Sequence, residues 1–197
     1  LVPMKPISRI MIAVAALALL VLLFVPIWRI DLQAPQYPEG LFIQIYADHF
    51  AGDVEKINGL NHYIGMGTIH DEMFPEFVYL PKVLIGLAVF GVLAAVWGKR
   101  QGLFAGLITL TVFGLWALYD MYKWRYSYGH DLDPRAAIKV EGQAYQPPLI
   151  GHKKLLNFDA WSTPDTGGWI LFGVLALLAG VYFLELRRKR PAKPLTA

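Results

Sequence analysis

The side chains best suited to hold a metal ion lie in one short stretch of the sequence. His62, Met66, His70 and Met73 fall within twelve residues. If the stretch is helical, 100° per residue places His62, Met66 and Met73 within about 40° of one another. His70 then lies about 80° away on the same helix. Imidazole and thioether together suit copper, because thioether sulfur prefers Cu(I) and imidazole binds either oxidation state. The residue types and their spacing therefore make this stretch a candidate copper-binding segment.

Such a helix is too long for all four side chains to share one ion. His62 and Met73 are eleven residues apart, which is about 16 Å along a helix axis. His62 and Met66 are therefore expected to form half a site, completed by another segment of the chain. His130 and His152, from a later part of the sequence, are the candidates for that role.

Two other uses of these residues are possible. In a purely structural one, Met66 and Met73 pack the stretch against the membrane surface, with His62 hydrogen-bonded beside them. In the other, acid–base groups serve a membrane enzyme that acts on lipid or quinone; the groups are His130, Asp131, Asp133 and His152. Because nothing in their spacing sets a catalytic geometry, we do not expect an enzyme.

The composition excludes several cofactors. The 197 residues include no cysteine, which rules out disulfides, thiolate zinc sites, iron–sulfur clusters and covalently attached c-type haem. All five histidines fall outside the long apolar stretches, so we expect no haem between helices. Phosphate-binding and dinucleotide-binding motifs are absent from the sequence, and we expect no nucleic-acid partner.

Four apolar stretches are long enough to cross the roughly 30 Å hydrocarbon core of a bilayer, which takes about 20 helical residues. The chain is 56% hydrophobic with a mean hydropathy of +0.43, and its charges gather between these stretches. Because a backbone in lipid must satisfy its own hydrogen bonds, each stretch is predicted to be an α-helix. The predicted spans are 10–28, 79–98, 102–122 and 168–186. The first is expected to stay as an anchor, since its apolar region exceeds that of a signal peptide.

Charge differs between the two sides of the membrane. One side holds nine basic residues and one acidic residue, a charge of +8, in short segments such as Lys99–Arg100 and the tail 187–197. The other side holds nine basic and fourteen acidic residues, a charge of −5, spread over two long loops. Since cytoplasmic segments beside spans are enriched in Lys and Arg, we expect both termini in the cytoplasm of a bacterial inner membrane.

The two long loops, 29–78 and 123–167, are predicted to pack together on the extracytoplasmic side. Turn-forming residues and β-rich segments favour short strands there. The expected elements are strands at 41–46 and 138–145, a broken helix at 58–73 and a helix start at 131–134. The predicted fold class is an all-α membrane protein, a four-transmembrane-helix bundle whose two extracytoplasmic loops form a small α+β cap.

Charged residues near the middle of a span would indicate an ion or proton pathway. Because the predicted spans carry charged residues only near their ends, we expect no such pathway. Asp120 and Lys123 lie three residues apart near the outer end of the third span. We expect them to form an ion pair at the end of that helix. The helices are therefore expected to serve as a scaffold for the loops.

Five strings of sequence in and beside the loops carry a resemblance to a known family. They are Ala34–Leu41, Asn58–Met66, Met73–Phe77, Pro147–Phe158 and Gly167–Trp169. These strings resemble a bacterial membrane family whose members tend to be encoded with nitrous oxide reductase maturation genes, near the copper chaperone of that system. The likeness extends over most of the chain but carries over no catalytic residue.

What the resemblance implies is a role in delivering copper to, or inserting it into, a periplasmic copper enzyme. The implied cofactor is copper, and the implied partner is a copper chaperone or copper enzyme complex. The leading hypothesis is thus an accessory membrane protein that binds or relays copper. The alternative is a structural or assembly subunit of a larger membrane complex, without a ligand of its own.

Overall fold

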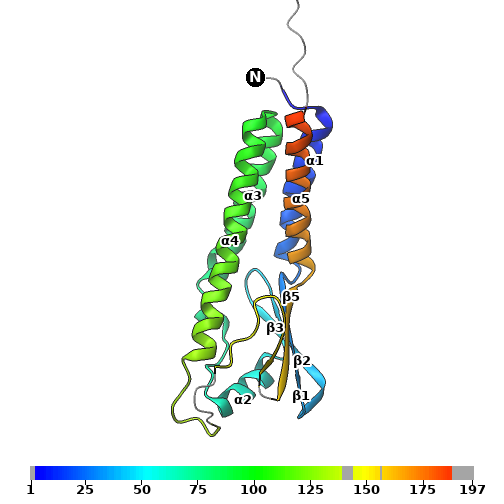
Figure 1. The fold of residues 1–197 in the computed structure, drawn as a ribbon. Coiled ribbons are helices and arrows are strands. Elements are labelled where there is room, and N and C mark those ends of the chain that lie inside the picture. The colour runs from blue at the N-terminus through cyan, green and yellow to red at the C-terminus, as the bar shows by residue number, and fades with distance from the viewer. Residues whose placement is uncertain (1–2, 139–143, 156, 188–197) are drawn as a thin grey trace, which may run out of the picture.

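The computed structural model describes residues 3–138, 144–155 and 157–187. Seven helical segments are present in these residues: α1 (Pro6–Ala18), η1 (Leu19–Leu23), α2 (Val54–Ile64), η2 (Asp71–Met73), α3 (Glu76–Trp97), α4 (Arg100–His130) and α5 (Thr166–Arg187). Five strands lie between them: β1 (Trp28–Ala34), β2 (Tyr37–Ile45), β3 (Phe50–Gly52), β4 (Gly151–Leu155) and β5 (Phe158–Pro164). The four long helices form one end of an elongated molecule, and the sheet forms the other, with α2 and the last turns of α4 beside it (Figure 1).

The prediction of an all-α protein is wrong, because the five strands form one antiparallel sheet. The strand order is β3-β2-β1-β5-β4, with both loops contributing strands. The fold is therefore α+β. The misassignment follows from the helices, which hold most of the apolar residues and dominate the composition.

Four helices are long and apolar enough to span a membrane: Pro6–Leu23, Glu76–Trp97, Arg100–His130 and Thr166–Arg187. The first ends five residues earlier than predicted, because Trp28 begins β1. The third continues eight residues past the predicted end at 122, to His130. Its outer part therefore belongs to the domain that contains the sheet rather than to the apolar span.

The four long helices form a closed bundle. α1 contacts α3 and α5, and α4 contacts the same two helices. Its buried core is made of small and branched side chains: Ile12, Ala15, Ala88, Leu103 and Val174. Toward the sheet, the α3–α4 hairpin and the α1–α5 pair spread apart (Figure 1).

The sheet joins the two loops directly to the helices. β1 follows the first span, β5 leads into α5, and these two strands pair from Trp28↔Pro164 to Gln33↔Asp159. Where the pair meets the helices, the backbone of Gly168 lies against Ile27; a Cβ on Gly168 would lie 2.5 Å from the Ile27 carbonyl oxygen. This central pair makes the two loops one domain.

The loop elements expected from sequence are partly present. The strand expected at 41–46 overlaps β2. Residues 131–134 begin no helix, because α4 occupies the chain up to His130. Of the strand expected at 138–145, residues 139–143 lie outside the described residues, and Ile138 and Tyr145 belong to no strand. β1, β3, β4 and β5 were not expected.

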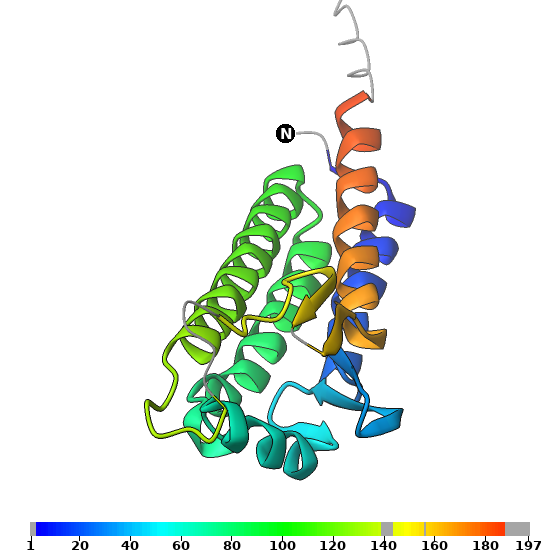
Figure 2. The same cartoon turned by 60° about the horizontal axis from the view of Figure 1, so that its bottom comes forward.

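α2 lies at the far end of this domain. It packs on β2 and lies between the outer end of α4 and the β1–β2 hairpin (Figure 2). Its buried side is formed by Ile57, Asn58 and Asn61. A space lined by side chains from the sheet, α2 and α4 is the setting of the candidate site.

Candidate functional site

The helix that carries His62 ends before it reaches Met66. α2 stops at Ile64, and Gly65 adopts a left-handed φ of +79°. The Met66 N–H donates to the Asn61 carbonyl at 3.0 Å. This is a common way for a helix to end, because glycine takes the left-handed conformation without steric cost. The single helical face predicted for His62, Met66 and Met73 is therefore wrong.

His62 and Met66 lie in different surroundings. Met66 is only 9% exposed and lines an apolar cavity of about 70 Å³ between the sheet, α2 and α4. Ile43, Ile57 and Tyr145 line the same cavity. His62 is exposed on α2, with its ring centroid 6.2 Å from that of Tyr63. Met66 thus packs in the core of the domain, whereas His62 faces solvent.

His70 and Met73 are brought together by a turn. The Met73 N–H donates to the His70 carbonyl at 3.1 Å, at the start of η2. Residues joined by such an i to i+3 bond have Cα atoms within about 7 Å. Both residues are exposed, Met73 by 59%, and the His70 imidazole makes no hydrogen bond to any described residue. One imidazole and one thioether are thus available at the same surface turn.

The other three histidines each have a ring nitrogen occupied. Nδ1 of His130 lies 2.8 Å from the Tyr126 carbonyl, and its ring stacks on Tyr126 at 4.0 Å. Nε2 of His152 lies 2.7 Å from Asp159. His49 is bound to its neighbour Asp48 at 2.6 Å. These contacts fix the ring orientations and leave the second nitrogen of His130 and of His152 available.

The described residues contain no group of three or more His, Asp or Glu side chains placed to hold a metal ion. The acid–base residues considered for an enzyme are not grouped either, because two of them pair with other side chains. Asp133 pairs with Arg135 at 3.2 Å, and His152 pairs with Asp159. Among the described residues, any metal site is therefore an open one, with few ligands from this chain.

A cluster of aromatic rings connects the η2 turn to α4. Phe50, Phe74 and Phe77 are mutual neighbours with centroids 4.9 to 5.5 Å apart. Trp124 lies 5.2 Å from Phe74 and stacks on Tyr128 at 5.1 Å. Offset and edge-to-face ring pairs of this kind add about 0.5–1.5 kcal/mol each beyond their buried area. The cluster holds the turn against α4.

Two buried asparagines fix the segment between α2 and η2. Asn58 donates to the Ile69 carbonyl at 3.0 Å and accepts from the Ile69 N–H at 2.7 Å. Asn61 donates to the Tyr128 hydroxyl at 2.5 Å. Because Ile69 precedes His70, the Asn58 pair sets the position of the exposed turn. Sequence reasoning missed both asparagines; their signal is a polar residue repeated three positions apart on the apolar side of α2.

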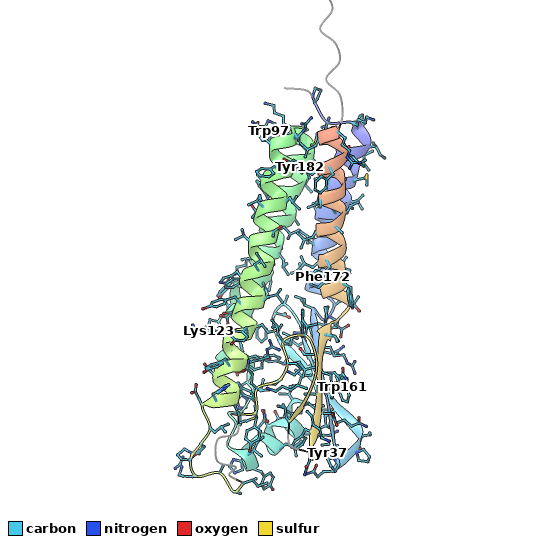
Figure 3. The ribbon with its side chains drawn as sticks, in the orientation of Figure 1. Tyr37, Trp97, Lys123, Trp161, Phe172 and Tyr182 are labelled. Atoms are coloured by element: carbon cyan, nitrogen blue, oxygen red, sulfur yellow. The ribbon has the colours of Figure 1, made fainter. Side chains whose placement is uncertain are left out.

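A second pocket lies where α3 and α4 meet the sheet. It has a volume of about 140 Å³ and is lined by aromatic residues from both sides, including Trp28, Phe50, Trp116 and Trp124. Glu76 and Asp120 also line it. The ion pair expected between Asp120 and Lys123 is absent from the described contacts. Figure 3 places Lys123 on the side of α4 that faces away from the sheet.

Segment 144–148 packs against the outer part of α4 and buries polar atoms. The Tyr145 N–H donates to Gly129 at 2.9 Å. Arg125 is fully buried and donates to the carbonyls of Met121 and Pro148. One guanidinium nitrogen of Arg125 and the Tyr145 hydroxyl have no hydrogen-bond partner among the described residues. Arginine at this position was not singled out from the sequence, since nothing local distinguishes it from the surface charges.

Ion pairs around the domain shift several pKa values. A hydrogen bond to Asp31 raises the pKa of Arg29, with burial opposing it. A hydrogen bond from Arg135 lowers the pKa of Asp133. Burial raises the pKa of Asp165, but hydrogen bonds from Thr166 and Gln44 outweigh this, so that its pKa lies below the ordinary value of an aspartate. Exposed pairs of this type contribute little to stability.

Comparison with known proteins finds no relative of this chain. Neither a family model, nor a curated protein, nor a solved structure matches the chain.

Proposed function

We propose that the chain is an accessory protein of a bacterial inner membrane that relays copper to a periplasmic copper enzyme during its maturation. The carrying observation is the His70–Met73 turn, where an imidazole and a thioether are exposed within one turn of backbone. Thioether sulfur selects Cu(I), and imidazole is compatible with it. The partner is a copper chaperone or copper enzyme complex, as the family resemblance implies.

An open site suits a relay better than storage. Two ligands from this chain leave coordination positions free, which a partner protein fills when copper passes on. Glu72 lies inside the same turn and is exposed, so a carboxylate is also at hand. Of the residues expected from sequence, His70 and Met73 take the leading role. His62, His130 and His152 stay secondary candidates, and Met66 supports the fold.

The orientation proposed for the chain places this turn in the periplasm. The end of the bundle away from the sheet carries Lys5, Arg9, Lys99 and Arg100, and the N-terminus lies at that end (Figure 1). Basic residues beside spans favour the cytoplasm. The domain containing the sheet then lies on the opposite side, together with all five histidines.

The test is a Cu(I) competition titration of the full chain in detergent, against a chromophoric chelator. Removing a residue that only hydrogen-bonds to a metal ligand weakens metal binding by about 10- to 100-fold. Because His70→Ala and Met73→Leu each remove a ligand itself, each should weaken copper binding by at least about tenfold. Met66→Leu is the matched control, since it removes a thioether that lies in the core. Its binding should equal that of the wild type.

Two results would overturn the proposal. One is unchanged copper binding in the double variant His70→Ala with Met73→Leu. The other is a loss in Met66→Leu as large as that in Met73→Leu. If the wild type binds no Cu(I) but purifies in mild detergent with a second chain, the structural or assembly role is favoured instead.

A further inference from the structure

The pocket between α3, α4 and the sheet lies at the edge of the membrane. Glu76 is 22 residues before Gly98, and Asp120 is 21 residues after Lys99, on either side of the helical hairpin. At 1.5 Å per residue, both carboxylates are about 32 Å from the turn. The hydrocarbon core is about 30 Å thick. The pocket therefore opens at the headgroup level of the leaflet next to the sheet.

The walls of this pocket suit an organic cation. Trp28, Phe50, Trp116 and Trp124 present aromatic rings to it. Glu76 and Asp120 are its only acidic or basic lining residues among those described. Aromatic faces attract ammonium groups and do so more strongly when water is excluded. A bare metal ion would need several converging oxygen ligands, whereas most of this lining is carbon.

Neither carboxylate forms an ion pair with another described residue. Glu76 accepts one hydrogen bond, from the Tyr79 hydroxyl at 3.2 Å. Asp120 has no hydrogen bond or ion pair with a described residue, although Lys123 is one turn away. Two carboxylates facing one largely apolar pocket leave a negative charge that a ligand can balance.

We propose that this pocket binds the primary ammonium headgroup of a phospholipid such as phosphatidylethanolamine. Its three N–H donors match the two carboxylates, and the methylenes beside it lie against the rings. The volume of about 140 Å³ compares with the roughly 150 Å³ cavity that holds a benzene molecule. The acyl chains stay in the bilayer. This proposal does not depend on copper binding.

The test measures lipid binding to the full chain in detergent by tryptophan fluorescence, because three tryptophans line the pocket. The probes are short-chain phosphatidylethanolamine and phosphatidylglycerol with the same acyl chains. The ethanolamine lipid should bind about tenfold more tightly, as expected for one desolvated cation–π and carboxylate contact. Asp120→Asn and Glu76→Gln should remove that preference. The control is Asp131→Asn, because the Asp131 carboxylate is exposed beyond the end of α4. This variant should keep the preference for the ethanolamine lipid.

Equal binding of the two lipids to the wild type would overturn the proposal, and this comparison needs no variant. A full preference retained in Asp120→Asn with Glu76→Gln would overturn it as well. Phosphatidylcholine is a third probe. Because its ammonium cannot donate hydrogen bonds, binding as tight as that of phosphatidylethanolamine would rule out the primary ammonium as the recognised group.

Discussion

The two ends of the helix bundle are held together by different kinds of contact. At the end away from the sheet, the buried carboxylate of Glu185 accepts from the Ser8 hydroxyl at 2.6 Å and the Lys5 N–H at 3.1 Å. Arg9 donates to the carbonyls of Ala95 and Val96, both at 2.8 Å. Side chains there bind the termini of neighbouring helices directly.

At the other end, the described residues show no side-chain hydrogen bond between the ends of two of the four long helices. The helices are joined through the β1–β5 pair, and the wedge between the sheet and α4 is filled by the aromatic cluster around Trp124. A sheet is wider than a helix cap, so it separates the two helix pairs and leaves pockets between them. The two ends thus differ in how the helices are joined: side chains bind helix ends directly at one end, whereas the sheet separates the helix pairs and leaves pockets at the other.

The largest expected effect tests how tightly the sheet is joined to the helices. Gly168→Val places a side chain 2.5 Å from the Ile27 carbonyl oxygen and 2.8 Å from Pro164. Overpacking at such a site should lower the free energy of unfolding by about 3 kcal/mol. Denaturant unfolding in detergent measures this loss. Gly173→Val, on the same helix with no atom within 4 Å, is the control.

A smaller effect is expected where the turn is fixed to α2. Asn58→Ala leaves the N–H and carbonyl of Ile69 without their buried partners. The free energy of unfolding should fall by about 2 kcal/mol. Gly59→Ala, which adds a methyl in open space on the same helix, should not lower it. A loss in Gly59→Ala as large as in Asn58→Ala would show that α2 itself, rather than the asparagine, is sensitive.

The closed end should respond less to a single change. Ser8→Ala removes one hydrogen bond to Glu185 and leaves the Lys5 N–H in place. We expect a loss of about 1 kcal/mol, measured by the same unfolding assay. Ser127→Ala, at an exposed position on α4, should have no measurable effect. If Ser8→Ala cost more than Gly168→Val, the ranking of the two ends would be reversed.

The smallest expected effect depends on pH. Hydrogen bonds to Asp165 at the start of α5 keep its pKa below the ordinary value of an aspartate in the folded chain. A carboxyl group whose pKa is lowered by folding stabilises the folded chain at pH values above its pKa in the unfolded chain. This contribution is lost as the pH falls through its pKa in the folded chain. Asp165→Asn should therefore be less stable than the wild type at neutral pH. The difference should shrink below about pH 4, as unfolding curves at pH 7 and pH 3 would show. An equal difference in stability at pH 7 and pH 3 would contradict the explanation from the lowered pKa of Asp165.

Part of the sheet was predictable from local pattern. β1 alternates apolar Trp28, Ile30 and Leu32 with polar Arg29 and Asp31, which is the period of a half-buried strand. The signal was overlooked because Trp28 closed a long apolar run. β4 offers no such signal: as an edge strand, it shows three exposed residues in a row.

The local composition of the chain was enough to determine four apolar helices and the absence of cysteine chemistry, and it placed every histidine outside the most apolar stretches. Those properties depend on runs of residues and their hydropathy, which need no distant partner. Only the tertiary structure decided which candidate ligands share a turn. Gly65 ended the helix that would have aligned His62 with Met73, and the turn at η2 paired His70 with Met73 instead.

The pocket beside Glu76 and Asp120 was also decided by tertiary structure alone. These carboxylates are 44 residues apart and meet because α3 and α4 run antiparallel from one short turn. The sheet then closes the pocket with Trp28 and Phe50, which lie more than 60 residues before Trp116 in sequence. Contacts over such separations depend on how the elements pack, and no local pattern encodes them.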